Sequence, residues 1–196
     1  NLSISLTRRQ RLLQELSNVL KWNYLPDPVS NHGDLEKFIY FKRKWINYSY
    51  NSLESKEKNS LLFDLSYSEG AFIAKEDLKS TFLQIRAPYK MPVFVLDKEN
   101  LMSSFYGLSG LQDIDFIEHP DFSKRFFLSG EDKKGIRSFF TDDLIFFFES
   151  HPLYYIESKG DSLLIRGKER LASIQEIKQM LAFAEQLIKL LKGKKT

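Results

Sequence analysis

Cysteine is absent from this 196-residue chain, which excludes disulfide bonds, thiolate catalysis, iron–sulfur clusters and zinc sites built on cysteine. Histidine occurs only at His32, His119 and His151, and none of these has a partner at the spacing of a metalloenzyme motif. The 9 glycines are scattered and form no dinucleotide-binding, phosphate-binding or nucleophile-elbow motif. These absences point away from several enzyme classes and leave the cellular compartment open.

Long apolar runs are also missing. No run exceeds the length of Leu144 to Phe148, which is far shorter than the roughly 18 residues that a membrane helix needs. No signal peptide is recognisable at the start of the chain. Because the chain begins at Asn1 and not at methionine, we expect that a natural upstream segment precedes it.

Aromatic residues are abundant, with 17 phenylalanines and an aromatic share of 14%, and hydrophobic residues make up 42% of the chain. This composition excludes disorder and provides ample material for a core. At roughly 100–200 residues per domain, the length predicts one domain. We expect an N-terminal amphipathic helix in 1–24, a single domain over 35–192 that could divide into two sub-lobes near 98–112, and a basic tail at 193–196.

Charge is concentrated at the two ends of the chain. The total is +3, whereas residues 1–24 alone carry +3 and residues 189–196 carry +4, so the region between them is mildly acidic. Lysines at the end of a helix also suit its negative pole, which is the simpler interpretation of the C-terminal charge. Electrostatic docking to lipid or nucleic acid is the alternative.

Hydrophobic periodicity predicts helices that begin in capping boxes at Thr7 and Ser173, and one helix from Ser129–Asp132 to Phe148. The ranges with the pattern of strands are 37–53, 60–67, 81–87, 93–96, 153–157 and 162–166, and the ranges 113–118 and 124–128 are also expected to be extended. Gly160 is expected in the turn of the last hairpin. Together these elements predict an α+β fold, with a mainly antiparallel sheet and helices packed on one face.

A dense acidic cluster lies within the extended range 113–118 and in the residues directly after it. Its members are Asp113, Asp115, Glu118, His119 and Asp121. Clustered oxygen ligands suit a hard cation, and paired carboxylates can act as acid and base. A metal site is therefore one interpretation of the cluster, and a solvated strand edge is the other.

Asp64 lies inside the apolar strand segment Leu61–Leu65. A buried carboxylate is costly unless it is paired, so we expect an ion-pair partner. Arg86 and Arg137 are the first candidates for that partner.

Two basic segments could form a charged surface. Their residues are Arg8, Arg9, Arg11, Lys42, Arg43 and Lys44. The second segment interleaves with aromatic residues, as a nucleic-acid stacking platform would. Buried aromatics with lysines that extend to solvent are the commoner case, so the sequence disfavours nucleic-acid binding.

Several short motifs in a fixed order resemble a family of uncharacterised bacterial proteins in which a soluble domain follows N-terminal membrane helices. The motifs are Leu62-Phe63-Asp64 with Tyr67, Pro92-Val93-Phe94-Val95-Leu96 with Glu99, Asp113-Ile114-Asp115-Phe116, His119-Pro120-Asp121-Phe122-Ser123, Phe127-Leu128-Ser129-Gly130-Glu131-Asp132, Ile136-Arg137-Ser138-Phe139-Phe140, and Gly160 with Leu163-Leu164. The resemblance implies a membrane anchor upstream of Asn1, and it implies no activity, substrate or cofactor.

The leading hypothesis is a non-enzymatic domain of a membrane-anchored bacterial protein, which binds a protein partner or a second copy of itself. The side of the membrane stays open, and a cytoplasmic protein is the alternative location. The alternative function is a metal-dependent hydrolase that uses the acidic cluster, and nucleic-acid binding is a weaker third hypothesis. No cofactor is expected.

Overall fold

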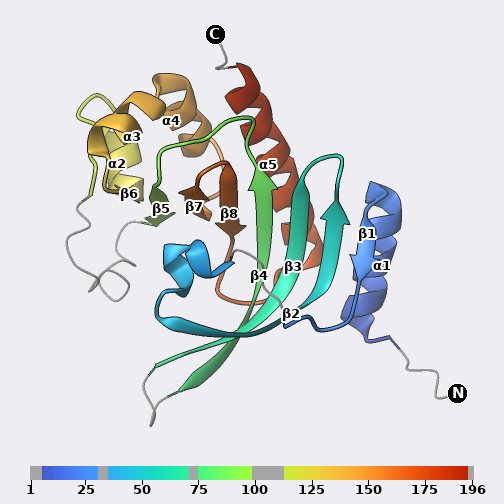
Figure 1. Ribbon diagram of the computed structural model, residues 1–196. Coiled ribbons are helices and arrows are strands. Elements are labelled where there is room, and N and C mark those ends of the chain that lie inside the picture. Colours follow the sequence, from blue (N-terminus) through green and yellow to red (C-terminus); the bar gives the residue numbers. More distant parts are fainter. Residues whose placement is uncertain (1–5, 31–34, 71–74, 99–112, 194–196) are drawn as a thin grey trace, which may run out of the picture.

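The computed structural model describes residues 6–30, 35–70, 75–98 and 113–193, and in these ranges eight strands form one antiparallel sheet (Figure 1). In sheet order the strands are β1 (Asn23–Leu25), β2 (Lys44–Ser55), β3 (Ser60–Glu69), β4 (Glu76–Arg86), β8 (Ser162–Arg166), β7 (Tyr155–Lys159), β5 (Val95–Lys98) and β6 (Phe126–Ser129). The expected α+β class is confirmed.

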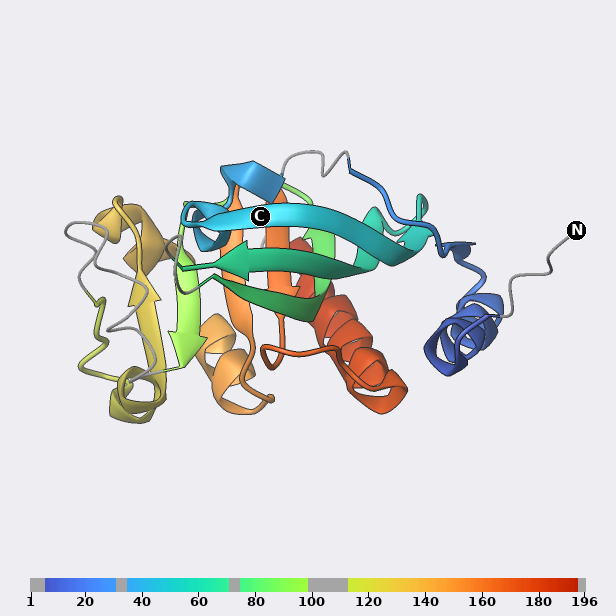
Figure 2. The same cartoon turned by 90° about the horizontal axis from the view of Figure 1, so that it is seen from below.

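The described helices contribute to a large core on one face of the sheet. They are α1 (Arg8–Leu20), α2 (Pro120–Arg125), α3 (Lys133–Phe139), α4 (Asp142–Glu149) and α5 (Ile174–Gly193). The opposite face carries a smaller core under two 3-10 helices, η1 (Leu35–Lys37) and η2 (Ile39–Phe41). Figure 2 shows the sheet between η1–η2 on one side and α1 and α5 on the other.

The two terminal helices begin as their capping boxes predict. The Thr7 side chain accepts a hydrogen bond from the backbone N–H of Gln10, and the Gln10 side chain accepts one from Thr7. Ser173 and Glu176 form the same reciprocal pair at the start of α5. Helix α1 ends at Lys21, which adopts the left-handed conformation with φ of 57°.

Four expected elements differ from the structure. The range 37–53 begins with η1 and η2 instead of a strand, since Phe38, Tyr40 and Phe41 pack as a cap on the second face. The expected helix up to Phe148 is two helices, because the backbone of Phe140 and Thr141 leaves the helical conformation between α3 and α4. No strand forms at 113–118, and α2 replaces the start of the extended run expected at 124–128.

The central strand β4 is covered on both faces, although its alternating sequence predicts a half-buried strand. Leu83 and Ile85 lie in the large core, and Phe82 lies in the smaller one. The stretch 98–112, where the sequence allows a division into two sub-lobes, lies outside the described residues apart from Lys98. Across the described part of the chain, none of the helices has the length and apolar character that crossing a bilayer requires.

Candidate functional site

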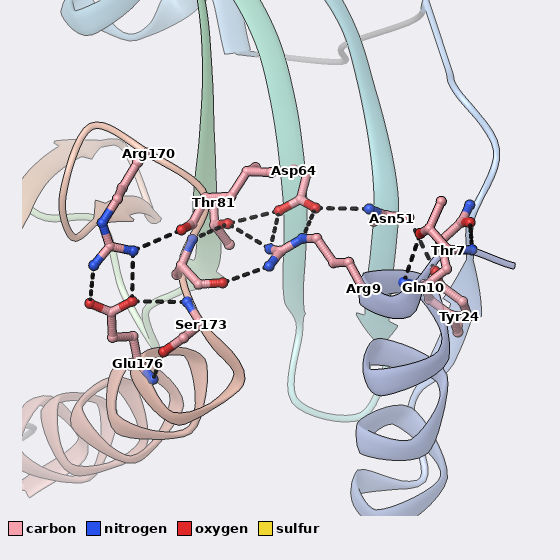
Figure 3. Close-up of polar contacts among 12 residues, drawn as sticks. Thr7, Arg9, Gln10, Tyr24, Asn51, Asp64, Thr81, Arg170, Ser173 and Glu176 are labelled. Atoms are coloured by element: carbon pink, nitrogen blue, oxygen red, sulfur yellow. Dashed lines mark hydrogen bonds and ion pairs between the residues drawn. The ribbon is translucent and has the colours of Figure 1, made fainter.

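A buried polar network joins α1 to the sheet (Figure 3). The Arg9 guanidinium donates to both oxygens of Asp64, with Nε to Oδ2 and Nη2 to Oδ1 both at 2.7 Å. Its Nη1 donates to the backbone carbonyl of Ala172 at 2.7 Å, just before α5. Asn51 donates to Oδ2 at 2.9 Å, and the Thr81 hydroxyl donates to Oδ1 at 2.7 Å. One arginine therefore fastens the first helix both to the sheet and to the start of the last helix.

The carboxylate of Asp64 is 1% exposed and each of its oxygens accepts two hydrogen bonds. A bidentate arginine pair of this kind is strong and geometrically specific. The network extends to Tyr24, whose hydroxyl donates to Asn51 at 3.1 Å. Burial, with the nearby charge of Asp64 as a second cause, raises the pKa of Tyr24 to about 12. We name this set of residues, Arg9, Tyr24, Asn51, Asp64, Thr81 and Ala172, the α1 clamp.

The partner of Asp64 is Arg9, so the expectation of Arg86 or Arg137 is wrong. Arg86 forms an exposed pair with Asp161 across the β4–β8 strand ends. Arg137 donates to the backbone carbonyl of Asp115 at 2.6 Å. The sequence does carry a signal for Arg9, because Arg9, Leu13 and Leu16 follow the spacing of one helix face that turns toward the sheet.

A second buried polar cluster lies under η2. Glu157 on β7 is 2% exposed and accepts the backbone N–H of Ile39 at 2.5 Å and of Tyr40 at 3.1 Å. The Tyr155 hydroxyl donates to the same carboxylate at 2.7 Å. Burial raises the pKa of Glu157, and these three donors oppose the increase. Glu157 thereby caps η2 from the strand below it.

Arg166 lies beside this cluster at the end of β8. Its guanidinium lies 5.1 Å from the ring centre of Tyr40 and 5.5 Å from that of Tyr155. Among the described residues its buried Nε has no hydrogen-bond partner. Arg166 and Asp97 both line a pocket of about 650 Å³ at the ends of β5, β7 and β8. Burial raises the pKa of Asp97, whose carboxylate accepts the backbone N–H of Lys98.

Sequence reasoning missed Asp97, Glu157 and Arg166 as site residues. Like Asp64, Glu157 and Arg166 are charged residues within apolar strand segments, and this pattern could have identified them. Their burial depends on η1 and η2, which cover a face of the sheet that the sequence pattern leaves open.

The acidic cluster does not converge on one point. Asp113 accepts the backbone N–H groups of Ile114 and Leu128, both at 2.9 Å, and thereby satisfies an N–H of β6, the outer strand. His119 pairs with Asp142 at 3.0 Å. The side chains of Asp115, Glu118 and Asp121 are exposed. In the part of the chain that the structure describes, no group of three or more His, Asp or Glu residues could hold a metal ion.

The six candidate basic residues have three different environments. Arg8, Arg11, Lys42 and Arg43 are exposed. Arg9 belongs to the α1 clamp, and the side chain of Lys44 is 4% exposed and pairs with Glu69. Of the aromatic residues next to the second segment, Phe38, Tyr40 and Phe41 are buried, and Trp45 is exposed. The segment therefore presents one exposed ring and not a series of stacked ones.

A groove of about 580 Å³ lies along α5, beside the C-terminal end of α1, on the large-core side of the sheet. Leu20 and Trp22 line it from the α1 side, and Leu83 and Ile85 of β4 form its floor. Figure 1 shows α1 and α5 side by side, running in the same direction. The rest of the lining comes from the turn at 57–60 between β2 and β3, from 86–88 at the end of β4, from Asp161 and from the C-terminal half of α5.

Comparisons with known proteins give one structural likeness. No family model matches the chain, and no curated protein matches it in sequence, so the resemblance to a family of uncharacterised bacterial proteins is not confirmed. The crystal structure of the mycobacterial trehalose monomycolate transport factor A, TtfA, is similar with a TM-score of 0.58. The match covers 93% of both chains at 10% sequence identity, which establishes a shared fold.

Proposed function

We propose that this chain is a non-enzymatic interaction domain of a bacterial protein that is held at a membrane by a segment upstream of Asn1. The observation that carries the proposal is the α1 clamp. Asp64, the charged residue most suited to chemistry by its burial, uses both carboxylate oxygens to fix α1 to the sheet. An anchor that precedes α1 would therefore hold the whole domain in a fixed orientation.

Two further observations support this proposal. The fold neighbour TtfA is named as a transport factor, a role compatible with a structural or interaction module. The family resemblance implies an upstream membrane anchor, which would lie directly before α1. We propose that the domain contacts a protein partner or a second copy of itself at this membrane.

The hydrolase alternative receives no support from the geometry. Asp113 and His119 are engaged with β6 and with Asp142, and the remaining acids of the cluster point to solvent. We therefore propose no reaction at residues 113–121.

Expression of the complete gene with its upstream sequence tests the membrane anchor. We expect the full-length protein to stay in the membrane fraction after washing with high salt and to be released by detergent, because hydrophobic insertion does not depend on ionic strength. The chain 1–196 alone is the control, and we expect high salt to release any of it that pellets. Full-length protein in the soluble fraction would contradict the anchor.

Reciprocal purification after cross-linking in intact cells tests the interaction role. We expect the full-length protein and its partner, or two differently tagged copies, to recover each other from the membrane fraction. Recovery that fails in both directions would contradict this role.

A further inference from the structure

The groove along α5 has an apolar floor and a partly apolar wall. Its floor consists of the buried side chains of Leu83 and Ile85, and half-buried Trp22, Leu181 and Ile188 form its walls. Its volume of about 580 Å³ lies within the range of roughly 300–1,000 Å³ that is usual for small-molecule sites. The interior therefore suits the apolar part of a small ligand.

The groove is also elongated. Its α5 lining extends from Leu181 to Lys192, which corresponds to about 16 Å along the helix at a rise of 1.5 Å per residue. A groove of this length along one helix fits an extended hydrocarbon chain better than a bulky ring system. A helix from a partner protein would need a wider apolar surface to dock on than these few side chains provide.

The charged residues that line the groove have a positive excess. Two cations at the rim are neutralised, since Lys58 pairs with Glu185 and Arg86 pairs with Asp161. Lys189 and Lys192 lie three residues apart on α5 and form no ion pair within the described residues.

One acid remains in the lining, Glu57 in the turn after β2. The two lysines lie on the last turns of α5, beyond the end of α1. An anionic group at the mouth of the groove would satisfy them.

We infer that the groove binds a single acyl chain that ends in a carboxylate. The hydrocarbon tail lies against Leu83, Trp22 and Leu181, and the carboxylate lies between Lys189 and Lys192. Burial of the tail provides most of the affinity, and the lysines select the charge of the head group. This inference rests on the proposed function only in giving the domain a binding role.

Titration of the chain with dodecanoate, below its micelle concentration, tests the inference. Trp22 lines the groove, so its fluorescence reports binding once the exposed Trp45 is removed by Trp45→Phe. We expect a saturable change with dodecanoate and none with acetate, which lacks the tail. Dodecyltrimethylammonium has the same tail with a positive head, and we expect it to bind about tenfold more weakly or less.

Charge-reversal variants separate binding in the groove from general detergent behaviour. Lys189→Glu with Lys192→Glu should weaken dodecanoate binding about tenfold or more. Lys178→Glu is the matched control, because Lys178 is exposed on α5 and does not line the groove. All three lysines are at the surface, so the variants should fold.

Equal affinity of the two variants, or no saturable signal with dodecanoate, would overturn the inference. Equal binding of the anionic and cationic chains would overturn the assignment of the head group. Neither result depends on whether the full-length protein is anchored at a membrane, so failure here is distinct from failure of the proposed function.

Discussion

At the scale of single residues, the stability of this fold depends on how buried charges are matched. Asp64 illustrates full matching, because one arginine, one amide and one hydroxyl satisfy its carboxylate. Asp97 illustrates partial matching, since burial outweighs the hydrogen bond from Lys98 and the charge of Arg166 and raises its pKa. These two aspartates should therefore respond in opposite ways to neutralisation.

Asp64→Asn should destabilise the protein by about 3 kcal/mol, because Arg9 loses its counter-charge and the new amide group meets hydrogen-bond donors. Unfolding by urea, followed by circular dichroism, measures this loss. Asp161→Asn is the control, since its pair with Arg86 is exposed and should contribute less than about 1 kcal/mol. An unchanged midpoint for Asp64→Asn would show that the clamp does not stabilise the fold.

Asp97→Asn should stabilise the protein at pH 8 and have little effect near pH 4. The folded-state pKa of Asp97 lies above the ordinary value of 3.8, so its ionised form is disfavoured in the folded state. This destabilisation is complete above the folded-state pKa and disappears as the pH falls to the unfolded-state value. Urea midpoints at pH 4, 6 and 8 check the trend. A less stable variant at pH 8 would mean that attraction to Arg166 outweighs burial.

At the scale of elements, the sequence predicts where the two terminal helices begin, but it does not predict where a helix is interrupted. Thr7 and Ser173 begin their helices where the capping boxes predict, since those hydrogen bonds are local. The break between α3 and α4 has no proline or glycine to mark it. Ile136, Phe140, Leu144 and Phe148 reach the same core from both helices, so the apolar stripe continues through the break.

The structure on the second face of the sheet is also not predictable from the local sequence pattern. Aromatic residues at 38–41 have high strand propensity, but they form η2 and cover the sheet. Tertiary contacts decide this outcome, because the backbone N–H groups of Ile39 and Tyr40 are satisfied by Glu157, more than a hundred residues away in sequence. Local pattern cannot reveal a capping residue at that distance.

The left-handed end of α1 gives a prediction at this scale. Lys21→Gly should stabilise the protein by up to about 1 kcal/mol, because glycine adopts a φ of 57° without the steric cost of a Cβ atom. Thermal melting measures the change. Lys178→Gly, in the interior of α5, should destabilise by about 1 kcal/mol and serves as the opposite control. A loss of stability for Lys21→Gly would contradict the prediction.

At the scale of the whole molecule, α1 belongs to the domain although the sequence presents it as a separate amphipathic segment. Leu13 and Leu16 are buried in the large core together with residues of α5 and β4. Arg9 adds the clamp to Asp64 and Ala172. The two basic ends of the sequence lie apart in the fold, and their described residues form no common charged surface. Arg8 begins α1 beside the clamp, and Lys192 lies at the far end of α5 (Figure 1).

Removal of residues 1–22 should therefore abolish cooperative folding and not simply release a tether. The truncated chain would leave Asp64 buried without a cation and would expose the core surface that Leu13 and Leu16 cover, and each loss is comparable to a large part of a typical domain stability of about 5–15 kcal/mol. Near-ultraviolet circular dichroism and thermal melting of 23–196 measure the effect. Arg9→Ala in the full chain should retain the fold with reduced stability, because the apolar contacts of α1 remain. If 23–196 melted cooperatively at the temperature of the full chain, α1 would be an independent segment, and an upstream anchor could not fix the orientation of the domain through it.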